Sequence, residues 1–373
     1  MRILLIGPTG NGGSLPPYLD ILTTALRGRG AHIDRLGTSG PPYDTGRSAF
    51  WSAERILAAT EQLLARIHFD DYDLLSVHYG NLEIEQLLPT LWPARRPPAV
   101  LHVHSLTPTL FTTHVPEPPL AAAVDRAADM MDGFVFFGEY GRGQWDRHHR
   151  SSAPSIVSWL PTTIPPGCRP TSDGPLHQAL AQCGGSVTGS LYGFAAPWKD
   201  LGVLLAACRR VTDRCKTLVA GPFWDDAAQT GIDLARRGSI EKVRAEVIVV
   251  PTYLGPADRA LLIRRSDFAV FPYRHHPAFQ GSGAIADYLV HGIPVVATDV
   301  ANMAELIGDA GIVTTPDDPT AFAAAIDRIV DDGTYRKALA TNAARRAHQF
   351  TANHHAAECL RFYAGVIESR GTS

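Results

Sequence analysis

Short apolar runs alternate with amphipathic segments along almost the whole chain, and this alternation restricts the fold more than any other feature. The run "RILLIG" is followed by apolar residues at helical spacing, from Tyr18 through Leu22 to Leu26. Later runs of strand length are "DLLSVH", "AVLHVH", "GFVFF" and "SIVSWLP". Continuous apolar strands are buried on both faces, and strands that alternate with helices form parallel sheets. The pattern predicts an α/β protein.

The alternation stops once and then restarts, which predicts two domains. The interruption is the Pro-, Gly- and Thr-rich stretch "LPTTIPPGCRPTSDGP", which has the composition of a linker. A length of 373 residues also exceeds one ordinary core. We expect two doubly wound parallel sheets, in residues 1–165 and 166–348, with a cleft between them. Ligands of such sheets bind outside the carboxyl ends of the strands.

Composition excludes several classes of function. A net charge of -3 gives no basic face for nucleic acid. The longest apolar runs have strand length, so we expect no membrane span. The start "MRILLIGPTG" is too short in apolar residues for a signal peptide, which favours a cytoplasmic protein. Five cysteines without a CxxC pair are typical of reduced, structural thiols.

The segment "QGSGAIAD" has the features of a phosphate-binding helix start. Gly281, Ser282 and Gly283 allow close approach of the backbone, and the helix amides carry a partial positive charge that suits a diphosphate. Asp287 follows one turn later, where a carboxylate can accept both hydroxyls of a ribose. The alternative is a helix cap followed by a tolerated acid.

Further binding residues are expected after other strands. Lys199, in "GFAAPWKDLG", is placed to reach phosphate oxygens, unless it is an ordinary surface lysine. His104 ends the run "AVLHVH", and a histidine there is either catalytic or a hydrogen-bonded structural residue. Gly12 and Gly13 lie in "GPTGNGGS", where amides can face an anion or simply form a flexible turn.

No metal site is expected. The Asp-x-Asp stretch at Asp71 and Asp73 precedes a strand, whereas metal-binding versions follow one. The His-His pairs lack the company of an HExxH or CxxC motif, so zinc is not predicted.

Several segments together resemble a known family. "LYGFAAPWKDLGVLLAA" is similar to its Gly-x-x-x-x-x-Lys-Gly stretch, with Lys199 at the lysine, and "DYLVHGIPVVATDV" is similar to its Glu-Ala-x-x-x-Gly-x-Pro-Val-Val stretch. The chain resembles the retaining glycosyltransferases of family 4, which have the GT-B fold. The resemblance covers nearly the whole length and is densest in the second half.

The resemblance implies where substrates bind. A nucleotide-sugar donor, with UDP favoured over GDP, would bind the second domain, and an acceptor would bind the first. Gly12, Gly13 and His104 would contact the sugar, and a terminal helix in residues 349–373 would cross back onto the first domain. No other cofactor is implied.

The sequence departs from the family pattern at three places. Phe279 and Gln280 stand where the family has a glutamate, and the second acid is Asp287 instead of glutamate. "QGSG" looks like a Gln-Ser-Gly variant with one glycine inserted, so Gln280 joins the three following residues as a donor-binding group. Phe194 replaces an arginine. Lys199 would then carry the leaving diphosphate almost alone.

Two supporting residues complete the predicted site. Arg274 would assist at the phosphates, and Tyr253 would flank the base. The expected activity is metal-independent, retaining transfer of a hexose or amino-hexose to a small polar acceptor, without stable membrane association. The alternatives are a nucleotide-sugar epimerase, a pseudo-glycosyltransferase, and an inactive nucleotide-sugar binding protein.

Overall fold

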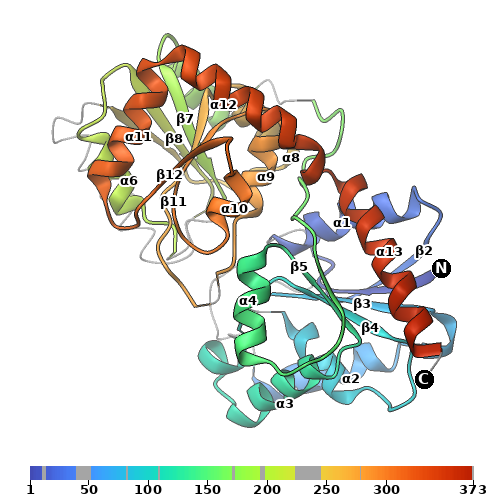
Figure 1. The fold of residues 1–373 in the computed structure, drawn as a ribbon. Helices are drawn as coiled ribbons and strands as arrows, with labels where there is room; N and C mark the ends of the chain where they lie inside the picture. The colour runs from blue at the N-terminus through green and yellow to red at the C-terminus, as the bar shows by residue number, and fades with distance from the viewer. Residues whose placement is uncertain are drawn as a thin grey trace. The chain divides into compact units, whose positions relative to one another are not determined.

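The computed structural model describes residues 1–10, 14–38, 52–80, 83–107, 110–169, 173–193, 198–222, 245–277 and 279–371. Contacts divide the chain into two compact units (Figure 1). Unit 1 comprises residues 1–160, 277–280 and 352–373, and unit 2 comprises residues 161–276 and 281–351. The sequence placed its divisions at 165 and 348. The contacts place residues 161–165 in unit 2, where Thr162 and Thr163 hydrogen-bond to Asp287.

Unit 1 contains one parallel sheet of six strands in the order β2-β1-β3-β4-β5-β6. Its strands are β1 (Arg2–Ile6), β2 (His32–Leu36), β3 (Leu74–Tyr79), β4 (Ala99–Val103), β5 (Gly133–Phe136) and β6 (Ser155–Val157). β1, β3, β4, β5 and β6 lie in the apolar runs of the sequence. β2 does not, because only two residues of its sequence "HIDRL" are apolar, as suits a strand at the sheet edge.

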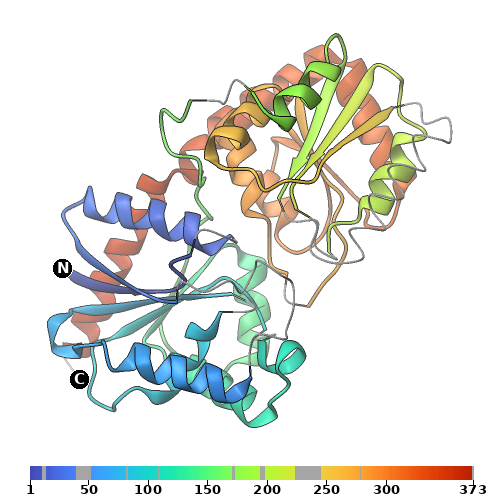
Figure 2. The ribbon, with the colours of Figure 1, turned by 180° about the vertical axis from the view of Figure 1, so that it is seen from behind.

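Helices cover both faces of this sheet, as Figure 2 shows from behind. The helices of unit 1 are α1 (Leu15–Arg27), α2 (Ala53–Leu64), α3 (Pro118–Asp129), α4 (Glu139–His148) and α13 (Ala352–Gly371), with short turns η2 (Phe69–Asp71), η3 (Ile84–Leu91) and η4 (Leu110–His114). Successive residues of β1 face opposite sides: Ile3 and Leu5 pack with α1 and α13, whereas Leu4 and Ile6 pack with α2 and η3. The first and last helices therefore share one core.

Unit 2 contains a second parallel sheet of six strands, in the order β12-β11-β10-β7-β8-β9. Its strands are β7 (Val187–Tyr192), β8 (Cys215–Ala220), β9 (Glu246–Val250), β10 (Phe268–Phe271), β11 (Val295–Thr298) and β12 (Gly311–Thr314). The two sheets confirm the predicted fold class of paired, doubly wound parallel domains. β12 was not predicted, and it is a half-buried edge strand.

The helices of unit 2 are α5 (Pro175–Gln182), α6 (Leu201–Cys208), α8 (Pro256–Arg264), α9 (Gly283–Val290), α10 (Met303–Ile307), α11 (Pro319–Asp331) and α12 (Gly333–Arg346), followed by η5 (Ala347–Phe350). α11 packs against α6, and α12 packs against α9. None of the helices described in either unit is long and apolar enough to cross a membrane.

The strand order locates a ligand-binding edge in each unit. In unit 2, the chain runs outward from β7 to β9 and then returns to the other side of β7 as β10. In unit 1, the reversal lies between β1 and β3. Ligands of open α/β sheets bind at the carboxyl ends of the strands at such a switch point.

Candidate functional site

Lys199 lies at the switch point of unit 2. Its backbone pairs with Tyr273, which follows β10, and its Nζ donates to the carbonyl of Tyr192 at the end of β7 over 2.9 Å. The turn at Gly193 has φ of +102°, and a Cβ there would lie 2.9 Å from Nζ, so glycine makes room for the ammonium. Burial lowers the pKa of Lys199 to about 7. In the part of the chain that the structure describes, no acidic side chain forms an ion pair with Lys199.

Tyr273 connects the lysine to the start of α9. Its ring lies 5.9 Å from Nζ of Lys199, and its hydroxyl lies 3.2 Å from Oγ of Ser282. Ser282 is the N-cap residue of α9, yet its side chain does not accept a hydrogen bond from the helix amides. The structure thus brings Lys199 near the helix start that the sequence predicted to bind phosphate. Tyr273 was missed as a site residue, although it lies in the run "DFAVFPY".

The two glycines at the start of α9, Gly281 and Gly283, have different surroundings. A Cβ on Gly281 would lie 2.0 Å from Oδ1 of Asn302, so the backbone approaches that side chain too closely for any other residue. Gly283 is exposed and begins the helix. The close approach at Gly281 fixes the path of the loop, and the exposed Gly283 leaves the first turn of α9 open.

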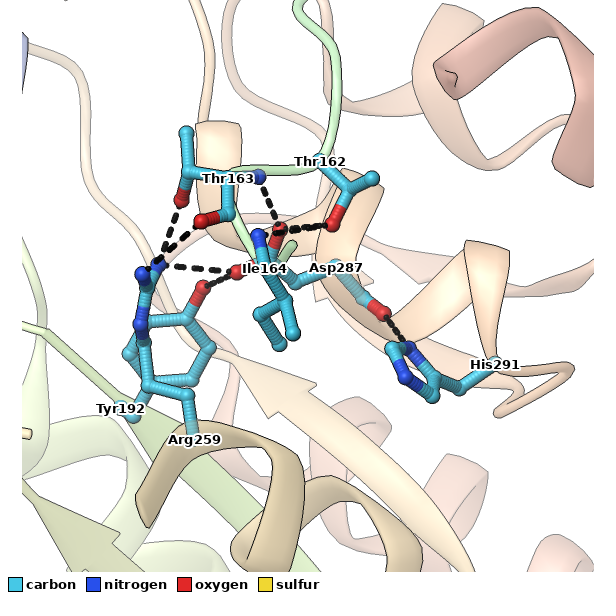
Figure 3. Close-up of polar contacts among 7 residues, drawn as sticks. All are labelled: Thr162, Thr163, Ile164, Tyr192, Arg259, Asp287 and His291. Atoms are coloured by element: carbon cyan, nitrogen blue, oxygen red, sulfur yellow. Dashed lines mark hydrogen bonds and ion pairs between the residues drawn. The ribbon is translucent and has the colours of Figure 1, made fainter. Parts of the chain in front are cut away.

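Asp287 has a different environment from the one expected of a ribose ligand. Oδ1 accepts hydrogen bonds from Oγ1 of Thr162 (2.6 Å) and the amide of Thr163 (2.9 Å) (Figure 3). Oδ2 accepts from the hydroxyl of Tyr192 and from Nη1 of Arg259 (3.1 Å). The residue is 0% exposed. Four protein donors occupy the lone pairs of a carboxylate, so a ribose contact would require Asp287 to release some of them, and that contact stays a prediction.

The partners of Asp287 are themselves held in place. Arg259 is buried, and its guanidinium also donates to the carbonyl of Thr163 (3.2 Å). Burial, and then the Asp287 carboxylate, hold the pKa of Tyr192 well above its ordinary value, so its hydroxyl remains a donor. His291 donates from Nδ1 to the Asp287 carbonyl (2.7 Å). Sequence reasoning missed Arg259 and Tyr192, because neither carries a motif.

Two predicted supporting residues lie at the surface of unit 2. Arg274 is 52% exposed and forms an ion pair with Asp200 (2.7 Å), whose other oxygen caps α6 through the amide of Val203 (3.0 Å). Arg274 therefore already has a counter-charge, and phosphate support from it stays a prediction. Tyr253 follows β9 and is 45% exposed. Stacking of its ring on a base stays a prediction.

His104 lies at the carboxyl end of β4 in unit 1. Its Nε2 lies 3.3 Å from Nδ1 of His78, and its ring packs against Phe137. Burial lowers the pKa of His104 to about 3, so the imidazole is neutral at physiological pH. Gln280, buried in the same unit, donates from Nε2 to the carbonyl of Val103, the residue before His104. Unit 1 thus brings these two predicted residues to one strand end. Gly12, Gly13 and Phe194 lie outside the described residues.

Sequence comparisons relate the chain to enzymes that transfer sugars. Residues 187–332, which lie within unit 2, match the family model for glycosyl transferases group 1. The chain is 25% identical to the D-inositol 3-phosphate glycosyltransferase of Corynebacterium kroppenstedtii over 370 residues, which cover 91% of this chain and 79% of that protein.

Solved structures share the fold. Sucrose-phosphate synthase from Thermosynechococcus elongatus aligns with a TM-score of 0.75 at 16% identity, over 99% of each chain. Anabaena HepE in complex with UDP-glucose aligns with a TM-score of 0.71 at 18% identity, over 97% of this chain and 99% of that one.

Proposed function

The chain is a group 1 glycosyltransferase with the GT-B fold, and we propose that it transfers a hexose or amino-hexose from a UDP-sugar to a small polar acceptor. The observation that carries the proposal is the position of Lys199. It is a half-buried cation at the switch point of unit 2, beside the open first turn of α9. A diphosphate is the ligand that such a combination of ammonium and helix amides favours.

Unit 2 would stabilise the leaving group. When the bond between the anomeric carbon and the diphosphate oxygen breaks, negative charge develops on the diphosphate. Lys199 and the amides at Gly281–Gly283 would bind that charge without a metal ion. A bound diphosphate would also favour the charged form of Lys199, whose pKa burial lowers to about 7 in the free protein.

Retention of configuration requires no protein nucleophile in this scheme. The acceptor hydroxyl oxygen would bond to the anomeric carbon on the face that the diphosphate leaves, and its proton would pass to a phosphate oxygen. His104 and Gln280 of unit 1 would orient the sugar, together with Gly12 and Gly13. The choice of UDP is supported by HepE, which was solved in complex with UDP-glucose.

A Lys199→Ala variant tests the proposal. Loss of the cation at the leaving group should reduce kcat/KM by about 2–4 kcal/mol of transition-state stabilisation. The measurement is transfer from UDP-glucose across a panel of sugar and aminocyclitol acceptors, with product stereochemistry determined by NMR.

Lys216→Ala is the matched control. Lys216 lies near the beginning of β8, away from the carboxyl ends of the strands, and pairs with Glu246 (3.0 Å). Its removal should leave kcat/KM unchanged. A folded Lys199→Ala variant with the rate of the control would show that Lys199 does not bind the leaving group.

A further inference from the structure

A continuous chain of hydrogen-bonded polar side chains crosses the core of unit 1, between its sheet and the helices α1 and α13. One end is Glu358 on α13, and the other end is His104. The side chains between these ends belong to residues that are at most 2% exposed, namely Tyr18, Ser76, His78, His102, Ser158, His355 and Tyr363. A polar chain in an apolar core needs a reason, because each buried group costs free energy unless it is hydrogen-bonded.

The first half of the chain runs from α13 through α1 to β4. Oγ of Ser158 donates to Oε2 of Glu358 (2.5 Å) and lies 2.7 Å from Nδ1 of His355. Nε2 of His355 lies 2.9 Å from the hydroxyl of Tyr18. That hydroxyl lies 3.1 Å from Nδ1 of His102.

The second half runs from β4 through α13 and β3 to the predicted sugar-binding edge. Nε2 of His102 lies 2.6 Å from the hydroxyl of Tyr363, which lies 2.8 Å from Oγ of Ser76. Oγ of Ser76 also lies 2.8 Å from Nε2 of His78. Nδ1 of His78 is 3.3 Å from Nε2 of His104, which ends the chain.

Each group between the ends holds one transferable proton. Burial lowers the pKa of His355 to about 3 and those of His78 and His102 well below their ordinary value, so each imidazole is neutral with one N–H. Burial raises the pKa values of Tyr18 and Tyr363 well above the ordinary value, so both hydroxyls stay protonated.

The end at Glu358 decides the direction of every bond. A carboxylate only accepts, so the one proton of Ser158 points to Glu358, and Ser158 must accept from Nδ1–H of His355. His355 then accepts on Nε2 from the hydroxyl of Tyr18. In the same way, each following group donates to the group before it and accepts from the group after it. The last link requires Nε2–H of His104 to donate to Nδ1 of His78. Each link uses one proton and each member supplies one. The direction is therefore the same at every link when the Tyr18 hydroxyl, at 2.9 Å, and not the Cys359 thiol, at 3.6 Å, donates to Nε2 of His355.

We propose that Glu358, through this chain, holds His104 as the Nε2–H tautomer and leaves its Nδ1 as a bare acceptor for a donating hydroxyl of the sugar. Within the described part of the chain, no hydrogen bond involves Nδ1 of His104. Glu358 and the linking residues are positioning residues, because they act through His104. The ligand in this inference rests on the proposed function, whereas the tautomer does not.

The same core also contains residues that could bind a metal ion, but their hydrogen bonds argue against a metal site. Ligand atoms of His102, His355 and Cys359 lie within 4.8 Å of one another. The hydroxyl of Tyr18, however, already bridges the two imidazoles, on Nδ1 of His102 and Nε2 of His355. The nitrogen atoms that would bind a metal are therefore used within the chain.

Histidine tautomers are measured directly by long-range ¹⁵N–¹H NMR of the full-length protein labelled with [¹⁵N]histidine. A His104→Gln variant assigns the His104 signals. We expect a protonated Nε2 and an unprotonated Nδ1 at His104 in the wild-type protein without substrate. A proton on Nδ1 of His104 would overturn the proposal, whatever the enzyme transfers.

Glu358→Gln tests the direction of the chain. The amide of Gln can donate to Ser158, which allows every link to reverse and places a proton on Nδ1 of His104. His354→Gln is the matched control, because Nε2 of His354 contacts Oε1 of Glu358 (3.3 Å) from outside the chain. We expect a second tautomer in Glu358→Gln and the wild-type spectrum in the control. An unchanged His104 in a folded Glu358→Gln variant would contradict the proposal.

Activity separates this inference from the proposed function. In Glu358→Gln, kcat/KM for the UDP-sugar should fall about 10-fold, the loss of one hydrogen bond to the sugar, while the Kd for UDP alone stays unchanged. Absence of any transfer by the wild-type protein would contradict the proposed function and leave the tautomer result standing. A tautomer change without a change in kcat/KM would show that His104 does not accept from the sugar.

Discussion

At the scale of the residue, Asp287 contributes to the stability of unit 2 in a way that its sequence motif does not reveal. Its carboxylate is the counter-charge of Arg259, and both side chains are buried. Asp287→Asn keeps the shape, removes the charge and turns an amide group toward donors. Breaking a buried ion pair costs about 3–5 kcal/mol, and we expect a loss of this size in the free energy of unfolding, measured with urea.

Asp331→Asn is the matched control for this substitution. Asp331 pairs with Arg214 at the surface, where the side chains are 51% and 64% exposed. An exposed pair contributes about 0–1 kcal/mol, so the control should unfold almost as the wild type does. If Asp287→Asn is as stable as the control but binds UDP more weakly, the carboxylate is a nucleotide ligand and not a structural anchor.

At the scale of the element, α13 completes the core of unit 1 from the far end of the sequence. Val366 is 2% exposed and packs beside Gly133 of β5, where a Cβ would lie 3.1 Å from its Cγ2. Val366→Asp would bury a carboxylate with no partner, which costs several kcal/mol. We expect the variant to lose the cooperative unfolding of unit 1. The measurement is the circular dichroism signal of the protein during a urea titration.

Arg361→Asp places the same new side chain on the exposed face of α13. It changes the charge of the helix surface without entering the core, so its urea midpoint should stay close to that of the wild type. Equal stability of the two variants would mean that α13 does not dock on unit 1 in solution.

At the scale of the whole molecule, the chain has few basic side chains to offer a membrane. The net charge is -3, and the one basic stretch of the first 165 residues, "RGQWDRHHR", includes Arg142, which already pairs with Glu139 (2.5 Å). Each Lys or Arg near an anionic surface contributes about 1 kcal/mol. We therefore expect no cosedimentation with vesicles of anionic lipid at physiological salt, and activity on small polar acceptors.

Two acids of the stretch "LEIEQLLPTLW" do not contribute to the charge of the protein surface. Glu83 and Glu85 are both buried in the structure. Oε1 of Glu85 accepts a hydrogen bond from the amide of Thr38 (2.6 Å), and burial raises the pKa of the Glu85 carboxyl group. The chain carries 34 Lys and Arg against 37 Asp and Glu, so the vesicle prediction depends only on the scarcity of basic clusters. Strong binding to anionic vesicles, with transfer only to a lipid acceptor, would contradict it.

The sequence by itself determined the class of fold, and it located the residues that we propose to bind phosphate. Ten of the twelve strands that the structure describes lie in the runs expected to form strands, because strands buried on both faces are mainly apolar. The edge strands β2 and β12 were not predicted, since an edge strand is only partly buried. Lys199 and the glycines at the start of α9 were predicted as phosphate ligands, because phosphate binding requires a cation and small residues at fixed places along the chain.

Only the tertiary structure decided what the buried polar side chains do. Asp287 reads as a ligand in its motif, and its partners Tyr192, Arg259 and Thr162 are spread over residues 162–259. The chain from Glu358 to His104 likewise joins β3, β4, α1 and α13. Hydrogen bonds form only between atoms about 3 Å apart. A sequence pattern cannot predict such contacts when the residues come together only after both sheets and their helices have packed.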